Sequence, residues 1–345
     1  AEDGIRDSST SRGLGDVYKR QYQVNVDYDT PFNVYGGMQD NGNWSGPAYT
    51  WKRGGIRTLY WQYLVGGDGF YIAPDKENSR FGYGTSQNGD LYRYDKVSGY
   101  YQSIAPQSKE EQASLRFNWN AGFAKDPFNS DGVYYGSQFV HKSLDKGANW
   151  EIISPDLTTN DPEKLNQSES GGLTLDATGA ENYCTILVIE PSPVERDMIW
   201  AGTDDGNIQV TLDGGKNWSN LKGKIKGLPE YSWISKIHAS EHNAGTAIIV
   251  VDQHRMNDFR PYIFMTDDFG KSWKKITSNL PQNDYVKVVR QDPHNPNLLF
   301  AGMEHGVFAS WNMGKSWEKI NNNLPNVSVR DLRIQARDRD LVVAT

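Results

Sequence analysis

Five carboxylate side chains lie in short polar turns, where they could act on a bound substrate. They are Asp40, Asp68, Asp204, Asp205 and Glu304. Two facing carboxyl groups could serve as acid and base on a glycosidic bond, and their separation would decide between inversion and retention. The alternative is that Asp-Gly and Asp-Asn pairs only form hairpin turns. We favour the turn for any single residue, and both interpretations stay open for the group.

The same turns carry side chains that could bind a ligand without catalysis. The three turns are Gln39-Asp40-Asn41, Asp204-Asp205 and Glu304-His305. Amides, carboxylates and imidazole together supply both hydrogen-bond donors and acceptors, which suits a peptide or a glycan. We therefore expect these turns to form the ligand-binding surface.

Other chemistries find little support in the sequence. The glycine-rich segment at residues 66–69 lacks the Lys-Ser/Thr and the helix of a phosphate-binding loop. His238 and His242 would suit a metal only on a helix, because a strand would set them well apart. Arg57, Arg116, Arg255, Arg260 and Arg290 could contact anions, although we expect Arg260 to bond backbone carbonyls. We predict no cofactor and no metal.

A repeated motif indicates which elements position these turns. The motif Ser/Thr-x-Asp-x-Gly-x-x-Trp occurs four times, with starts 44 to 68 residues apart, and Asn replaces Asp in the last copy. We call each copy a box. The defining residues are Ser143, Asp145, Gly147 and Trp150; Thr211, Asp213, Gly215 and Trp218; Thr266, Asp268, Gly270 and Trp273; and Ser310, Asn312, Gly314 and Trp317.

The box chemistry is that of a structural turn. Asp and the hydroxyl residue can bond the backbone of the turn, Gly supplies a positive φ, and Trp can pack its apolar surface between neighbouring sheets. The loops lack the further carboxylates that a calcium cage needs. The boxes are therefore interpreted as structural.

The segments around the boxes predict an all-β propeller of four-stranded blades. Second strands are clearest at residues 199–202, 299–302 and 133–136, and weaker copies without a box occur at 34–37 and 81–84. Six blades and part of a seventh fit the length. Residues 341–345 repeat the pattern of 298–302 and then stop, so we expect a truncated blade and a fragment of a larger propeller protein.

Strand direction separates the boxes from the polar turns. Strands alternate in direction within a blade, so the third-to-fourth turn, which holds the box, lies on the face opposite the second-to-third turns and the interblade links. The functional face is then the one with the polar turns. A long interblade insertion at residues 155–182 emerges on that face and could either cap the mouth of a channel or be solvated.

Composition narrows the partners. The 345 residues carry Lys+Arg 36 against Asp+Glu 43, a net charge of -7, and no dense basic cluster, which argues against nucleic acid. The longest aliphatic stretch, residues 247–251, is too short to span a bilayer. Cys184 is the single cysteine, so no intrachain disulfide forms.

Residues 1–21 form a separate segment at the start of the chain. They are highly charged and show neither strand nor helix periodicity, so we expect a disordered arm. The segment also resembles translated sequencing-adapter sequence, and we assign no role to its charges. The propeller is predicted over residues 22–345.

The boxes resemble the bacterial neuraminidase repeat of sialidases, oligoxyloglucan-type hydrolases and the sortilin ectodomain. The chain is most similar to large secreted bacterial proteins that carry a sortilin-like propeller and are often labelled glycosyl hydrolases. Residues 35–42, 179–185, 202–206 and 258–262 carry this resemblance, which covers nearly all of residues 22–345. It implies boxes that lie away from the functional site, and a secreted or periplasmic location.

Three functions remain open. The first is an exported module that recognises a peptide or glycan on the face opposite the boxes, as the sortilin resemblance implies. The second is a glycoside hydrolase that uses paired carboxylates on a polysaccharide. The third is a non-catalytic scaffold within a larger cell-surface protein. Sialidase activity is not expected, because the chain has no sialidase-like Arg-Ile-Pro segment.

Overall fold

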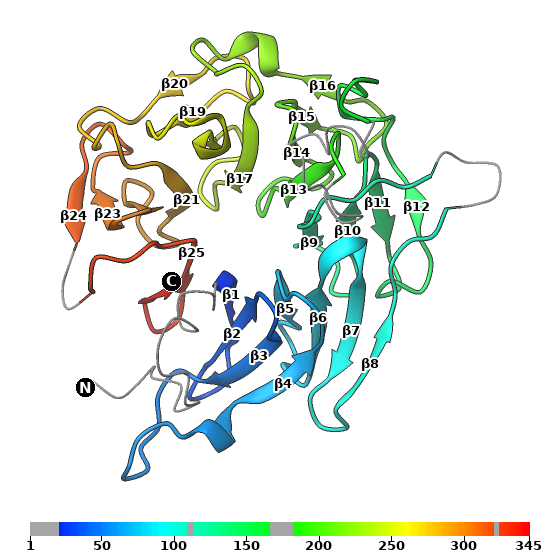
Figure 1. Cartoon of the computed structure of the whole chain (residues 1–345), viewed down its shortest axis with the longest axis vertical. Coiled ribbons are helices and arrows are strands. Elements are labelled where there is room, and N and C mark those ends of the chain that lie inside the picture. Colours follow the sequence, from blue (N-terminus) through cyan, green and yellow to red (C-terminus); the bar gives the residue numbers. More distant parts are fainter. Residues whose placement is uncertain (1–20, 109–113, 166–181, 321–323) are drawn as a thin grey trace. The chain divides into compact units, whose positions relative to one another are not determined.

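The chain folds into consecutive antiparallel sheets. The computed structural model describes residues 21–108, 114–165, 182–320 and 324–345, and Figure 1 shows their strands. Six four-stranded sheets follow one another, and a two-stranded sheet comes last. This confirms the predicted all-β propeller of six blades and part of a seventh. Residues 1–20 of the predicted arm and 166–181 of the predicted insertion lie outside the described residues.

Two compact units make up the chain, and each is described by itself. The first comprises residues up to 104 together with 331–345, and the second comprises residues 105–330. Within the described residues, no helix is both long and apolar enough to cross a membrane.

The first unit contains two complete blades and the two-stranded sheet. Its strands are β1 (Gln21–Val26), β2 (Asn33–Met38), β3 (Gly42–Pro47) and β4 (Gln62–Val65); β5 (Ile72–Pro74), β6 (Phe81–Thr85), β7 (Leu91–Asp95) and β8 (Tyr100–Ser103); and β25 (Asp331–Gln335) and β26 (Asp340–Ala344).

The second unit contains four blades. Its strands are β9 (Phe123–Lys125), β10 (Val133–Gly136), β11 (Val140–Ser143) and β12 (Glu151–Ile152); β13 (Ile186–Pro191), β14 (Ile199–Thr203), β15 (Ile208–Thr211) and β16 (Ser219–Asn220); β17 (Trp233–Ala239), β18 (Ala247–Asp252), β19 (Ile263–Thr266) and β20 (Lys274–Lys275); and β21 (Val286–Gln291), β22 (Leu299–Met303), β23 (Gly306–Ser310) and β24 (Glu318–Ile320).

Glycine near the end of a second strand makes room for the next blade. A Cβ atom on Gly202 of β14 would lie 2.4 Å from Cγ2 of Ile234, in the first strand of the following blade. Gly136 of β10 meets Ile186 in the same way, at 2.9 Å. Contacts this close exclude any side chain, so the recurring glycine reflects how tightly consecutive blades pack.

Hydrophobic cores form between neighbouring blades rather than within single sheets. One cluster joins Trp200 of β14 to Ile249 of β18 and Phe264 of β19, all almost fully buried. Another joins Ile263 of β19 to Val289 of β21. Each sheet is therefore stabilised mainly by burying its faces against the next one.

Each box occupies the third-to-fourth turn of a blade in the second unit. In the first box the hydroxyl of Ser143 accepts the N–H of Gly147 at 2.8 Å and donates to Asp145 Oδ1 at 2.8 Å. Asp145 in turn accepts the N–H of Asn149 at 2.8 Å. Gly147 has φ +88°. Hydroxyl, carboxylate and glycine thus close the turn on its own backbone, as the residue types indicate.

Three of the box tryptophans tie their turns to the preceding blade of the second unit. The Trp218 indole donates to the carbonyl of Ile153 at 2.9 Å, and the Trp317 indole donates to the carbonyl of Ile276 at 2.8 Å. Trp273 packs edge-on against Trp200, with ring centroids 6.2 Å apart. The boxes therefore join consecutive blades as well as closing their own turns.

The first unit closes the equivalent position of its second blade with a lysine. Lys96, in the turn between β7 and β8, donates to the Tyr35 hydroxyl of the preceding blade at 2.7 Å. The Tyr35 hydroxyl donates to Asp27 Oδ2 at 2.7 Å. Burial lowers the pKa of Lys96, and the charge of Asp27 opposes that shift. A short chain of hydrogen bonds thus links this turn to the preceding blade, as the tryptophan ring does in a box.

Candidate functional site

The predicted turn at residues 39–41 is held by its own network in the first unit. Asp68 Oδ1 accepts the backbone N–H of Asp40 at 2.7 Å, and Gln39 Oε1 accepts the Tyr22 hydroxyl at 3.0 Å. Asp40 is exposed with φ +58°, whereas Asp68 is buried. The structure brings Asp40 and Asp68 together, but the contact joins a carboxylate to a backbone rather than two carboxylates across a cleft.

The predicted pair Asp204 and Asp205 is buried in the β14–β15 turn. Asp204 is 1% exposed and accepts three hydrogen bonds, from the Thr185 N–H at 2.9 Å, the Thr185 hydroxyl at 2.6 Å and Asn118 Nδ2 at 2.9 Å. Burial and the neighbouring Asp205 raise the pKa of Asp204 to about 7, against the effect of these donors. Asp205 accepts the N–H of Thr159 at 2.6 Å and its hydroxyl at 2.8 Å.

The third predicted turn, Glu304-His305, makes two contacts between acidic and basic side chains. Glu304 lies 2.6 Å from the Lys287 ammonium, and His305 Nδ1 lies 3.2 Å from Asp284 Oδ1. Partial burial would raise the pKa of Glu304, but the hydrogen bond and charge of Lys287 outweigh it and lower that pKa. Glu304 is thus paired with an ammonium group of the protein, and the Asp284 carboxylate is in contact with the His305 ring.

A cavity of about 220 Å³ in the second unit collects groups from several loops. Among the predicted turn residues only Asp204 lines it, so the cavity does not gather the predicted carboxylates. The arginine candidate Arg255 also lines it. The full lining is Lys164, Tyr183, Asp204, Tyr231, Trp233, Asp252, Gln253, Arg255 and Met256.

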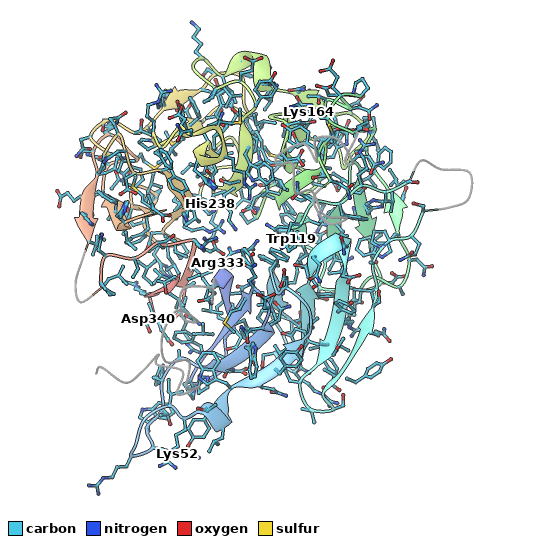
Figure 2. All side chains as sticks on the ribbon, viewed as in Figure 1. Lys52, Trp119, Lys164, His238, Arg333 and Asp340 are labelled. Carbon is cyan, nitrogen blue, oxygen red and sulfur yellow. The ribbon has the colours of Figure 1, made fainter. Side chains whose placement is uncertain are left out.

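Topology puts this cavity at the strand ends opposite the boxes. Tyr183 and Tyr231 lie in interblade links, and Asp204 lies in a second-to-third turn. Asp252 ends β18, and residues 253–256 begin the connection between the second and third strands of the β17–β20 blade. Lys164 belongs to the long insertion that we predicted on that face, and Figure 2 labels it.

The two cations of the cavity lie against aromatic rings. Lys164 Nζ is 5.3 Å from the Tyr231 ring centre and 6.0 Å from that of Tyr183. Arg255 Cζ is 4.2 Å from the centre of the Trp233 ring. Neither cation forms an ion pair with a carboxylate among the residues that the structure describes. Cation–π contacts of this kind hold long side chains in place while leaving their hydrogen-bond donors available.

Gln253 supplies a buried acceptor without a partner. The side chain is 2% exposed, and its Nε2 donates to the Glu230 carbonyl at 3.0 Å. Its Oε1 has no hydrogen-bond partner in the described structure. A buried polar atom of this kind costs free energy unless a ligand or water satisfies it. The amide orientation is fixed by the bond to Glu230, so the unsatisfied oxygen is a genuine feature of the lining.

The other acidic residue of the lining, Asp252, is in contact with His254 through one carboxylate oxygen. Asp252 Oδ1 accepts the backbone N–H of His254 at 3.0 Å and lies 2.6 Å from His254 Nδ1. The His254 ring stacks on Tyr285, with centroids 4.9 Å apart. This arrangement holds the 252–256 connection against the next blade.

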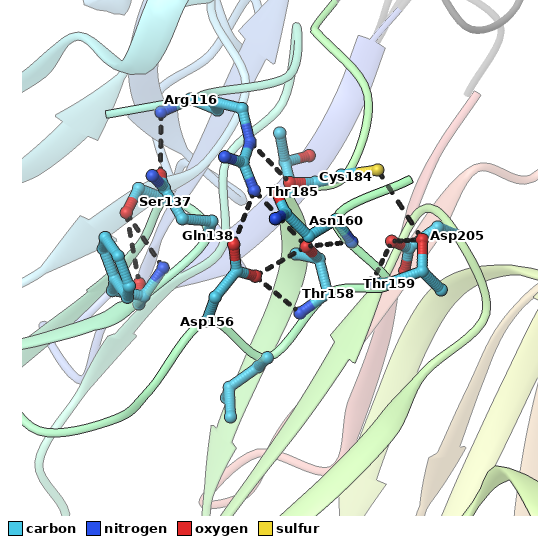
Figure 3. Close-up of polar contacts among 12 residues, drawn as sticks. Arg116, Ser137, Gln138, Asp156, Thr158, Thr159, Asn160, Cys184, Thr185 and Asp205 are labelled. Atoms are coloured by element: carbon cyan, nitrogen blue, oxygen red, sulfur yellow. Dashed lines mark hydrogen bonds and ion pairs between the residues drawn. The ribbon is translucent and has the colours of Figure 1, made fainter. Parts of the chain in front are cut away.

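A polar network holds the start of the insertion, and Figure 3 shows its contacts. Arg116 pairs with Asp156 at 2.7 Å and donates to the Cys184 carbonyl at 3.3 Å. The Asp156 carboxylate also accepts the N–H and the hydroxyl of Thr158, at 2.9 and 2.6 Å. Together with the bonds from Thr159 to Asp205, these contacts set the path of the chain toward Lys164. The start of the insertion is therefore held by both side-chain and backbone hydrogen bonds.

Two further expectations can be compared with the geometry. Arg260 does not bond backbone carbonyls as we predicted; its guanidinium pairs with Asp258 at 2.7 Å, because that carboxylate lies only two residues away. The described residues contain no cluster of three or more His, Cys, Asp or Glu placed to hold a metal.

Sequence reasoning missed most of the cavity. Lys164, Tyr183, Tyr231, Trp233, Asp252, Gln253 and Met256 were not proposed as site residues. Tyr183 lies within the segment 179–185 that carried part of the family resemblance, and Lys164 lies within the insertion 155–182 that was expected on this face. The others come from links and connections without a repeated pattern.

Comparisons by sequence find no relatives: no family model and no curated protein matches the chain. Solved structures do match. A GH74 xyloglucanase from Xanthomonas campestris has TM-score 0.65 and 14% identity over 95% of this chain and 51% of that one. The extracellular domain of a putative one-component system from B. thetaiotaomicron has TM-score 0.57 and 12% identity over 96% of this chain and 38% of that one.

A third match limits what the fold can say about function. The WD40 repeats of RRP9 have TM-score 0.61 and 9% identity over 96% of this chain and 88% of that one. At these identities the likeness establishes the propeller fold alone. The chain spans about half or less of the length of the xyloglucanase and of the sensor protein's extracellular domain.

Proposed function

We propose that this chain is an extracytoplasmic recognition module that binds a glycan or a peptide on the face opposite the boxes. The cavity between the β13–β16 and β17–β20 blades is the observation that supports this proposal. Its aromatic walls, together with two cations and one buried acceptor that have no acidic or donor partner among the described residues, are typical of a binding pocket. The extracellular or polysaccharide-cleaving proteins with a similar fold support the location and the glycan alternative.

Binding can be tested with the full 345-residue chain on glycan and peptide arrays. Trp233→Ala and Arg255→Ala should each abolish or strongly weaken the strongest signal. Arg260→Ala is the matched control, because its exposed guanidinium pairs with Asp258 and does not line the cavity. If the arrays give no hits, or if the cavity variants bind like wild type, the recognition proposal is wrong and the scaffold alternative gains.

Glycoside hydrolysis is the second candidate, and one observation favours it. Asp204 and Asp252 both line the cavity, and burial together with the neighbouring Asp205 raises the pKa of Asp204, which is the direction that suits a general acid. The three donors on Asp204 count against this role, because they leave little of the carboxyl group for a substrate. Turnover of a polysaccharide panel that Asp252→Asn abolishes would favour the hydrolase over simple binding.

A further inference from the structure

The unsatisfied groups of the cavity define the chemistry of its ligand. Gln253 Oε1 needs a hydrogen-bond donor, and the part of the chain that the structure describes provides none. Lys164 and Arg255 need an acceptor, and a charge-assisted bond to an anion is the strongest that they can form. The ligand should therefore combine at least one N–H or O–H donor with an anionic group.

The two carboxylates that line the cavity do not neutralise Lys164 and Arg255. Asp204 already accepts three hydrogen bonds from Thr185 and Asn118, and Asp252 is engaged by His254. Neither forms an ion pair with Lys164 or Arg255. The positive charge of the two cations is consequently left to face the cavity.

The walls favour a sugar ring over a peptide. Tyr183, Tyr231 and Trp233 line the cavity, and Tyr231 is 46% exposed, so part of its ring is accessible to a ligand. Met256 is the single non-aromatic apolar residue of the lining, so an aliphatic peptide side chain would find no matching pocket. At about 220 Å³ the cavity is also smaller than sites for extended ligands and suits one monosaccharide unit.

We infer that the cavity binds an acidic monosaccharide unit, such as a hexuronate, within a polysaccharide. The carboxylate of the sugar would contact Arg255 and Lys164, a hydroxyl would donate to Gln253 Oε1, and the C–H face would stack on the exposed aromatic rings. This inference rests on the proposed recognition function and specifies its ligand class.

Calorimetric titration of the full chain with trigalacturonate and with its methyl ester tests this directly. The two probes share size and linkage and differ in charge. We expect trigalacturonate to bind about tenfold or more tightly than the ester, because a charge-assisted bond is roughly twice as strong as a neutral one. The preference should shrink as salt is raised, since the cations are partly exposed.

Substitutions in the cavity separate the contribution of its positive charge to binding from that of its shape and hydrogen bonds. Arg255→Ala and Lys164→Met should each remove most of the preference for the acid while leaving binding of the ester nearly unchanged. Gln253→Leu should weaken both probes, because it removes an acceptor for a hydroxyl that both carry. Arg260→Ala should change neither. The Arg and Lys substitutions alter only side chains at the surface of the cavity, so they should leave the fold intact.

The outcomes of these experiments separate the inferred acidic ligand from the proposed recognition function on which it rests. If neutral glycans bind as tightly as acidic ones and Trp233→Ala abolishes both, recognition stands and the acidic ligand is wrong. If only peptides bind at the cavity, recognition again stands and the sugar is wrong. If neither uronate binds and no array ligand is lost in Trp233→Ala, both the inference and the proposed function are overturned.

Discussion

The two units hold their third-to-fourth turns against the preceding blade by different means. In the second unit the connection is apolar and backbone-directed: the Trp317 ring is 3% exposed, and its indole donates to the Ile276 carbonyl. In the first unit, Lys96 reaches across to the Tyr35 hydroxyl, which donates to Asp27. Both devices join consecutive blades at the same topological position.

The comparison shows that the blade needs a contact at this position rather than a particular motif. In a box, a tryptophan ring packs on the preceding blade and donates a hydrogen bond to a carbonyl, so little charge is buried. The lysine obtains it from charged groups, whose desolvation offsets much of the attraction. We therefore expect the box to be the more stabilising of the two.

The third-to-fourth connection of the first blade, residues 48–61, makes a further contrast. It carries neither a box nor a buried cation, and its residue Trp51 is 75% exposed. Figure 2 labels Lys52, the neighbouring residue, at the edge of the molecule. The Trp51 ring therefore lacks the burial that the Trp317 ring has.

The largest expected effect is on a box tryptophan. Trp317→Ala should lower the free energy of unfolding by about 3 to 5 kcal/mol, because it leaves a cavity in a packed cluster and an unpaired Ile276 carbonyl. Guanidinium titration of the full chain followed by tryptophan fluorescence and circular dichroism measures the loss.

Trp51→Ala is the matched control for that variant. Its ring is mostly solvated, so its loss should change the free energy of unfolding by less than about 0.5 kcal/mol. Equal losses in the two variants would show that the box ring does not owe its effect to burial against the preceding blade.

A smaller effect is expected from the lysine contact of the first unit. Lys96→Met should cost about 1 to 3 kcal/mol, because the Tyr35 hydroxyl loses a donor and a nearby cation is removed. Asp27 keeps its bonds from Tyr35 and from the N–H and amide of Asn33, which limits the loss.

A double-mutant cycle with Tyr35→Phe isolates the coupling between Lys96 and Tyr35. Denaturant titration of the two single variants and the double variant supplies the four free energies. A loss in Lys96→Met equal to or larger than that in Trp317→Ala would reverse the ranking of the two devices.

The sequence predicted the boxes well because their information is local. A hydroxyl, a carboxylate, a glycine and a tryptophan at fixed spacing determine the bonds within the turn, and the same spacing recurs in four blades. The glycine of the second strands was equally readable, since Gly202 and Gly136 meet the following blade in the same way. Repetition turns a tertiary contact into a sequence pattern.

The candidate site could not be predicted in the same way. Its walls come from segments that differ between blades: an insertion supplies Lys164, links supply Tyr183 and Tyr231, and a connection supplies Gln253. The carboxylates that were predicted as site residues instead bond neighbouring groups of the protein. Asp68 accepts a backbone N–H, and Glu304 pairs with Lys287. Lys96 was missed for a related reason, because a single lysine in a turn is indistinguishable from a solvated one.

The smallest expected effect concerns acid. Hydrogen bonds from Ser272, first its hydroxyl and then its backbone N–H, lower the pKa of Asp268 to about 2. Because this value lies below that of an unfolded Asp, about 3.9, the stabilisation is complete above about pH 4 and is lost as the pH falls toward 2. Asn312 occupies the same position in the fourth box, accepts the N–H of Ser316 at 2.9 Å, and cannot titrate in this range.

Exchanging Asp and Asn at this position tests whether the box carboxylate makes stability depend on pH. Unfolding midpoints in guanidinium between pH 5 and pH 2 should fall less steeply in Asp268→Asn than in wild type, and more steeply in Asn312→Asp. Near pH 7 the first substitution should be mild, because an amide oxygen already serves this position in the fourth box. Identical acid profiles in all three proteins would mean that the carboxylate contributes through its shape and hydrogen bonds alone, in which case the charged and uncharged boxes are equivalent at every pH.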